Sequence, residues 1–191
     1  MRIALIGPAH PDHGAAARHT TELAYRLAAA GHNVIIESWR APDPAASGLA
    51  DGDPYPRTYR RLAWYRPDTW IAAGRRLRSA DLVVFALPGQ AQVPSYLSVL
   101  TALALGPDRP RTALICHAAL PDAGPGGQGL TRTLLARADT VIVHSAAQAA
   151  QARALAAEVP IVIARMPPHL GPPDPEPYWS AYLHALGVTP A

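Results

Sequence analysis

The sequence lacks several features that would point to particular classes of protein. Its 191 residues include one cysteine, Cys116, which excludes an internal disulfide and is typical of a reducing compartment. No apolar run approaches the roughly 20 residues that a membrane-spanning helix needs, and the apolar stretch after Arg2 is too short for a signal peptide. These absences predict a cytoplasmic protein.

Lysine is absent altogether. All 17 basic residues are arginine, against 14 acidic residues, and the net charge is +3. Since no dense basic run with interleaved aromatic residues accompanies this small excess, we expect no nucleic-acid partner. The arginines could instead bind phosphate groups or an anionic membrane surface, which leaves a peripheral membrane contact open.

Motifs for metal and cofactor chemistry are also missing. One cysteine and scattered histidines do not have the spacing of a zinc site, and there is no GxSxG elbow of a serine hydrolase. The sequence has neither the glycine fingerprint of a dinucleotide site nor the GK[ST] of a P-loop. Glu37 is the nearest acidic candidate for binding a ribose. We therefore predict no metal site and no cofactor.

Hydrophobic residues make up 49% of the chain, and 21 prolines mark its loops. Short apolar segments alternate with helical patterns, which is typical of strands buried on both faces of a parallel sheet. These segments are Arg2–Gly7, Val34–Ser38, Leu82–Leu87, Thr112–Cys116, Asp139–His144 and Pro160–Ala164. The pattern predicts an α/β fold with a doubly wound, mostly parallel, Rossmann-like sheet of six strands and helices on both faces; a seventh strand is left open.

The first 38 residues predict a unit of strand, loop, helix and strand. Apolar residues at helical spacing predict a helix over Ala15–Ala30, and Gly31 lies where a C-terminal cap belongs. Ligands of open parallel sheets bind beyond the carboxyl ends of the strands, where a helix N-terminus attracts phosphate. Gly14, which closes the first loop, could therefore let a phosphate approach the backbone. Alternatively, it only permits a tight turn.

A histidine follows the fourth predicted strand. His117 comes directly after Cys116, so we expect it at the carboxyl edge of the sheet, on the same side as Gly14. An imidazole there can donate a hydrogen bond to a developing charge or orient a substrate hydroxyl. The alternative is a structural histidine that bonds to a loop carbonyl.

Three further segments allow more than one interpretation. Trp39–Arg66 is predicted to be a long irregular loop, and the overlapping Tyr55–Pro67 interleaves arginines with aromatic residues. That stretch could bind an anionic, lipid-linked or sugar partner, or be an ordinary amphipathic connector. The glycine-rich Pro121–Gly129 could cradle phosphate, form a lid or be a plain surface loop. Tyr178–Leu186 is predicted to be a short helix with an apolar stripe, including Trp179, that needs a packing partner.

Several segments together resemble a known family. They are RIALIGP, HGAAARHTTELAYRLAAAGHNV, SADLVVFA, LICH, RADTVIVHS and VPIVIARMPPHLG. The helix that ends in GHNV and the segment ADTVIVHS are the most specific of them. Together they resemble the N-terminal domain of family 4 retaining glycosyltransferases, which have the GT-B fold of two Rossmann-like domains facing each other across a cleft. The resemblance covers residues 1–171, and residues 172–191 would form a proline-rich exit and a short C-terminal helix.

The resemblance implies roles for individual residues. In the family the N-terminal domain mainly binds the acceptor and the C-terminal domain binds the nucleotide sugar. The glycine-containing first loop lies by the donor's phosphates and the acceptor; the family usually has two adjacent glycines there, whereas this chain has His13 and Gly14. The histidine near the transferred sugar matches His117, which is the predicted catalytic residue. From their position at the start of the helix, we also expect Arg18 and His19 to reach the cleft and bind substrate.

The resemblance does not extend to a donor-binding half. The chain is thus expected to be the acceptor-binding half of a nucleotide-sugar-dependent hexosyltransferase, inactive alone. Its partners would be a nucleotide-sugar donor, a hydroxyl acceptor, and a second Rossmann-like half or another copy of itself. One alternative is a non-catalytic partner module that docks through Tyr55–Pro67 and the stripe at Trp179; another is an unrelated nucleotide-binding enzyme. Sugar transfer requires Gly14 and His117 on one side of a cleft that the chain's own tail does not fill.

Overall fold

The computed structural model describes residues 1–40, 54–106, 108–120, 127–167 and 176–188. Its strands form one parallel sheet of seven, in the order β3-β2-β1-β4-β5-β6-β7. The strands are β1 (Arg2–Ile6), β2 (Asn33–Trp39), β3 (Thr58–Leu62), β4 (Leu82–Leu87), β5 (Arg111–Cys116), β6 (Thr140–Val143) and β7 (Ile161–Ile163). The winding reverses between β1 and β4, which lie side by side at the centre, and the predicted doubly wound fold is confirmed.

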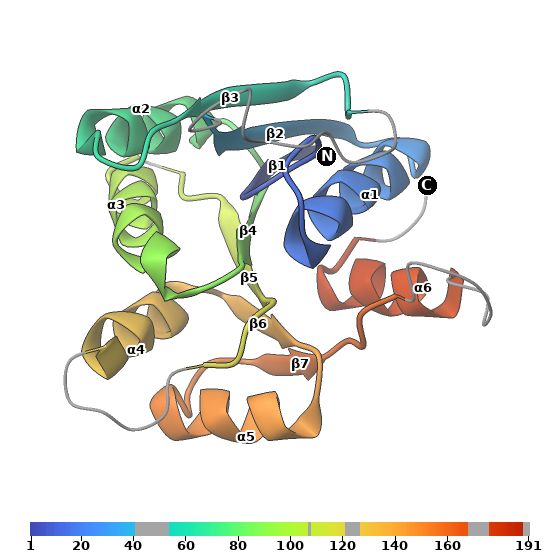
Figure 1. Cartoon of the computed structure of the whole chain (residues 1–191), viewed down its shortest axis with the longest axis vertical. Helices are drawn as coiled ribbons and strands as arrows, with labels where there is room; N and C mark the ends of the chain where they lie inside the picture. The colour runs from blue at the N-terminus through green and yellow to red at the C-terminus, as the bar shows by residue number, and fades with distance from the viewer. Residues whose placement is uncertain (41–53, 107, 121–126, 168–175, 189–191) are drawn as a thin grey trace.

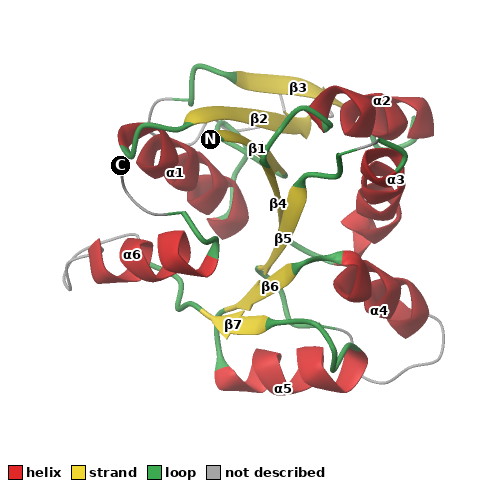
Figure 2. Cartoon of the chain, turned by 180° about the vertical axis from the view of Figure 1, so that it is seen from behind, coloured by secondary structure: helices red, strands yellow, loops and turns green. Residues whose placement is uncertain are grey.

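The helices cover the two faces of the sheet unequally (Figure 1). One face carries α1 and α6, and the other carries α2, α3, α4 and α5, as Figure 2 shows from behind. The helices are α1 (Ala15–Ala29), α2 (Pro67–Leu77), α3 (Val93–Ala104), α4 (Gly127–Arg137), α5 (Ala146–Leu155) and α6 (Glu176–Ala185), with a short 3-10 helix, η1 (Gln90–Gln92), before α3. Gly31 has a φ of +84° just after α1, which confirms the predicted helix end.

The central strands are buried on both faces, as their unbroken apolar sequences predict. All six residues of β4 are buried. Alternate side chains along the strand join different clusters: Val83 and Phe85 pack under α2 and α3, whereas Leu82 and Val84 pack under α1. This alternation follows from the two-residue period of a strand and divides the core into two layers.

One part of the sheet departs from the sequence-based expectation. Trp39–Arg66 was expected to be irregular, but it contains the whole of β3, and Trp39 ends β2. The sequence of β3, TYRRL, has little apolar character because the strand lies at the edge of the sheet and pairs only with β2. An edge strand keeps its arginines in contact with solvent, so the hydrophobic pattern gives no signal for it. Residues 41–53 of the expected loop lie outside the described residues.

Candidate functional site

The first loop leads from the carboxyl end of β1 into α1. Gly14 occupies the N-terminal cap position with a φ of +114°, and a Cβ added there would meet no atom within 4 Å. Backbone conformation, not crowding, therefore favours glycine at this position. No side chain caps α1, and its first turn contains no acidic residue, so its first N–H groups face the carboxyl edge with a partial positive charge. This is the local arrangement that attracts phosphate.

His117 lies where the sequence places it, at the end of β5. Its backbone N–H donates to the carbonyl of Leu87 over 2.9 Å, which continues the pairing of β5 with β4 by one residue. The imidazole is half-buried, and its ring centre is 4.9 Å from that of His19 in the second turn of α1. The end of β5 and the start of α1 therefore meet at the same edge, as sequence reasoning predicted.

The predicted substrate-binding residues divide into two groups. His13, Gly14 and Arg18 are exposed. His19 is fully buried, with 0% of its surface exposed. A helix of the same chain covers His19 and separates it from solvent. The contact of His19 with substrate stays a prediction.

That covering helix is α6, whose packing partner could not be predicted from the sequence. The ring of Trp179 stacks on His19 with the centres 5.1 Å apart, and the ring of Tyr182 lies 4.6 Å from the same imidazole. Both aromatic side chains are buried, and α6 lies beside α1 (Figure 1). The C-terminal helix thus covers one face of the sheet, but it leaves Gly14 and its exposed neighbours uncovered.

Sequence reasoning missed His144 as a member of this cluster. It follows β6 as His117 follows β5, and their ring centres are 5.2 Å apart. Its Nδ1 lies 3.0 Å from the carbonyl oxygen of Ala164 and 2.8 Å from the hydroxyl of Tyr182. The carbonyl of Ala164 can only accept, so Nδ1 must carry a proton to bond it, whereas the hydroxyl of Tyr182 can either donate to Nδ1 or accept from it. The rule that located His117, a histidine ending a parallel strand, would have found His144 as well.

Burial sets the protonation of His144 and Tyr182. It lowers the pKa of His144, and the hydrogen bond to the Ala164 carbonyl opposes the shift only in part. Burial also raises the pKa of Tyr182, which keeps its hydroxyl protonated. The two groups are therefore neutral near pH 7 and form an uncharged hydrogen-bonded pair beside His117.

Two other candidate residues have structural roles. Cys116 is buried and burial raises the pKa of its thiol to about 12, so it is a poor nucleophile. Glu37 is buried and accepts two bonds from Arg76, of 3.1 and 3.2 Å, and one of 3.4 Å from Arg61. Across the described part of the chain, no group of three or more histidine, cysteine or acidic side chains could hold a metal ion.

Part of the arginine-rich stretch Tyr55–Pro67 packs into the domain. Arg60 forms an ion pair of 2.9 Å with Asp12 and donates to the carbonyl of Ala9 over 2.9 Å. Trp64 stacks on Trp39 with ring centres 4.1 Å apart. These contacts support the interpretation as an amphipathic connector, and they show that Arg60 fixes the first loop, a role that sequence reasoning missed. Trp179 is buried as well, whereas Tyr65 in the arginine-rich stretch is 95% exposed.

The sequence was compared with protein families and with known proteins. The model for Glycosyltransferase Family 4 matches residues 16–166, which is most of the chain. The chain belongs to glycosyltransferase family 4. No curated protein matches it by sequence. Among the described residues of this family 4 chain, no helix has the length and apolar character needed to cross a membrane.

Solved structures share the fold of this family 4 chain at low sequence identity. The lipopolysaccharide outer core galactosyltransferase WaaB matches with a TM-score of 0.61 and 16% identity, over 91% of this chain and 49% of its own. An alpha-glucosyltransferase in complex with UDP-glucose and DNA containing an abasic site matches with a TM-score of 0.59 and 14% identity, over 88% and 43%. The family 4 chain spans less than half the length of both.

A third structure matches over almost its whole length. It is a sucrose-phosphate synthase from Thermosynechococcus elongatus, with a TM-score of 0.60 and 18% identity over 98% of this chain and 96% of its own. That structure is described by two residue ranges, 27–220 and 406–426. These neighbours are GT-B glycosyltransferases, and the GT-B resemblance inferred from the sequence is confirmed.

Proposed function

We propose that this chain is the acceptor-binding half of a nucleotide-sugar-dependent hexosyltransferase, and that the donor-binding half lies outside it. The family and the fold support a transferase. The matching alpha-glucosyltransferase structures are complexes with UDP and with UDP-glucose, which supports a nucleotide sugar as the donor. The sucrose-phosphate synthase structure is described by two residue ranges that omit the residues between them, and this chain matches almost all of it. This supports a donor-binding half that lies outside the matched region.

The observation that carries the proposal is the 4.9 Å contact between the rings of His117 and His19. It joins the end of β5 to the second turn of α1, whose N-terminus is Gly14. A phosphate-attracting helix end and an imidazole therefore share one edge of the sheet, which is where ligands of doubly wound folds bind.

Each group at this edge has a chemical task in the proposed reaction. The N–H groups at the start of α1, aided by Arg18, would stabilise the charge that develops on the leaving diphosphate. His117 would orient the acceptor hydroxyl or hydrogen-bond the transferred sugar, and His13 would border the same space. No covalent step is assigned to the chain, because catalysis by positioning and electrostatics is sufficient for these groups.

The test joins the full chain to the donor-binding half of a family 4 transferase and measures sugar transfer from UDP-glucose. Replacing His117 by alanine should lower turnover by about 100-fold or more, the usual scale for a positioned acid–base or hydrogen-bonding group. The midpoint of thermal unfolding should stay unchanged. His184→Ala is the matched control, since His184 is exposed on α6. Equal turnover of wild type and His117→Ala would remove His117 from the site. Robust transfer by the 191 residues alone would refute the absent donor half.

A further inference from the structure

Arg60, in the edge strand β3, binds three parts of the chain at once. Its Nη1 donates to the carboxylate of Asp12 over 2.9 Å and to the carbonyl of Trp39 over 3.0 Å. Its Nη2 donates to the carbonyl of Ala9 over 2.9 Å. The ion pair is partly buried, with 25% of the Arg60 side chain and 24% of the Asp12 side chain exposed. Because three acceptors fix the planar guanidinium, Arg60 holds the first loop against the ends of β2 and β3.

The carboxylate of Asp12 lies close to the proposed phosphate site. Asp12 comes two residues before Gly14, the N-terminal cap of α1. It is the one acidic residue in the loop of residues 7–14, and the first turn of α1 has none. A phosphate at the start of α1 would therefore meet a single negative charge of the protein nearby. Like charges at such short range repel, and a partly buried charge is screened less by salt than an exposed one.

The ion pair directs this carboxylate away from the candidate site. In the sheet, β2 and β3 lie on one side of β1, whereas β4 and β5 lie on the other. Arg60 holds Asp12 on the β3 side, and His117 follows β5 on the opposite side. Without Arg60 the carboxylate would lose its cation and its fixed direction. The N-terminus of α1 attracts any anion, so Asp12 would then compete there with a phosphate.

We propose that Arg60 is a positioning residue of the transferase edge, which keeps the N-terminus of α1 open to the donor's diphosphate by holding Asp12 away from it. This inference rests on the proposed function, because it takes the start of α1 as the phosphate site. Arg60 does not touch the donor, since its guanidinium binds acceptors of the protein itself. It acts on the donor only through the charge of Asp12.

The test measures the KM for UDP-glucose in the joined enzyme described above. Arg60→Gln should raise this KM by about ten-fold or more, because one uncompensated carboxylate then faces the diphosphate. The increase should shrink at about 0.5 M salt, which screens the repulsion. Adding Asp12→Asn to Arg60→Gln should bring the KM back to within about three-fold of wild type. A merely structural role of Arg60 predicts neither the salt dependence nor this rescue.

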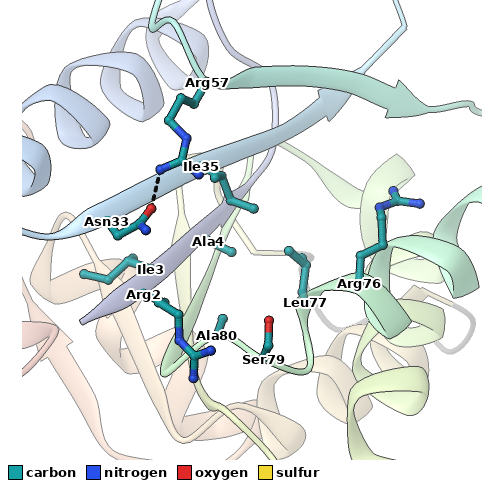
Figure 3. A pocket seen from close by; sticks show the side chains of 10 residues that line it. All are labelled: Arg2, Ile3, Ala4, Asn33, Ile35, Arg57, Arg76, Leu77, Ser79 and Ala80. Carbon is teal, nitrogen blue, oxygen red and sulfur yellow. Dashed lines mark hydrogen bonds between the residues drawn. The ribbon is translucent and has the colours of Figure 1, made fainter.

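Arg57→Gln is the matched control. Arg57 lies three residues before Arg60, but at the amino edge of the sheet, where its guanidinium donates to the side chain of Asn33 (Figure 3). The change removes the same charge from the same part of the chain and should leave the KM for UDP-glucose unchanged. The midpoint of thermal unfolding shows that each variant is folded.

Pyrophosphate binding separates this inference from the proposed function. Isothermal titration calorimetry on the full chain should show an affinity for pyrophosphate that falls in Arg60→Gln and recovers in the double variant. If this series holds but the joined wild type transfers no sugar, the proposed function fails and the inference stands. If the joined enzyme is active and Arg60→Gln has the wild-type KM, or Asp12→Asn gives no rescue, the inference fails and the proposed function stands. A wild type that neither binds pyrophosphate nor transfers sugar overturns both.

Discussion

The two faces of the sheet are built in different ways. On the face covered by α2, α3, α4 and α5, each helix precedes or follows the strands it covers, and the packed side chains are mainly aliphatic. On the other face, α1 packs beside α6, which lies more than a hundred residues later in the chain. Aromatic rings and imidazoles fill the space between them. An ion pair from Arg26 to Glu176 adds a link at the surface.

The two faces differ in the kind of side chain that fills their cores. An aliphatic core gains stability from burial and close packing, and it contains no polar side-chain atoms that must be hydrogen-bonded. A buried imidazole is costly unless its polar atoms are satisfied, and its orientation is then restricted. His19 and His144 contact His117 on the face that α6 closes. We therefore infer that the candidate site lies at the carboxyl edge beside the packing of α6 on α1, while the opposite face is held together mainly by aliphatic burial.

The largest effect should come from Trp179→Ala. Trp179 is buried against His19, and truncating a buried tryptophan to alanine typically costs about 3–5 kcal/mol. Chemical denaturation followed by tryptophan-independent far-UV circular dichroism measures the loss. Ser180→Ala, at the exposed next position of α6, should change stability by less than about 0.5 kcal/mol. A Trp179→Ala variant as stable as Ser180→Ala would show that α6 does not close this face.

The opposite face can be disturbed by adding one carbon atom. A Cβ at Gly74 in α2 would lie 2.6 Å from the Cβ of Ala102 and 2.7 Å from the carbonyl oxygen of Val99 in α3. Gly74→Ala should therefore separate the helices and cost about 1–3 kcal/mol, measured as a lower midpoint of thermal unfolding.

Gly129→Ala provides the control for this change. Gly129 is also helical, but a Cβ there meets nothing within 4 Å. Removing a helical glycine should then leave stability unchanged or raise it by up to about 1 kcal/mol. Equal effects of the two substitutions would contradict close packing of α2 on α3.

A smaller loss is expected from Tyr96→Phe on the same face. The buried hydroxyl of Tyr96 donates to the carbonyl of Ala86 over 2.8 Å, and deleting such a bond costs about 1 kcal/mol. The acceptors that the described residues offer to this hydroxyl are the backbone carbonyls of Ala86 and Ile6, which do not titrate. The loss should therefore be the same at pH 5 and pH 7 in urea denaturation. A loss that changes with pH would link this hydroxyl to a group that titrates.

The α1–α6 face should respond to pH instead. The folded pKa of His144 is lowered by burial, so the unfolded state binds more protons as the pH falls below about 6.5. Stability is full above that pH and declines as the pH falls toward the folded value. Urea denaturation between pH 7.5 and 5 should show a smaller decline for His144→Gln than for wild type. Parallel pH profiles would exclude His144 as the source.

Much of the fold could be predicted from the sequence. Unbroken apolar segments located the central strands, and a histidine directly after one of them placed His117 at the carboxyl edge. The edge strand Thr58–Leu62 was not predicted, because a solvent-facing strand needs no apolar pattern. The ion pairs of Arg60 and Glu37 were not predicted for a different reason. An ion pair joins residues that are distant in sequence, and composition does not reveal which arginine contacts which carboxylate.

The sequence by itself determined the parallel sheet, its family and the position of His117 at the end of β5, since strand burial and right-handed connections are local in origin. Only the tertiary structure decided that α6 folds back beside α1 and that His19 is buried beneath it. These features depend on contacts between segments far apart in the chain, and such contacts leave no periodic signal in either segment.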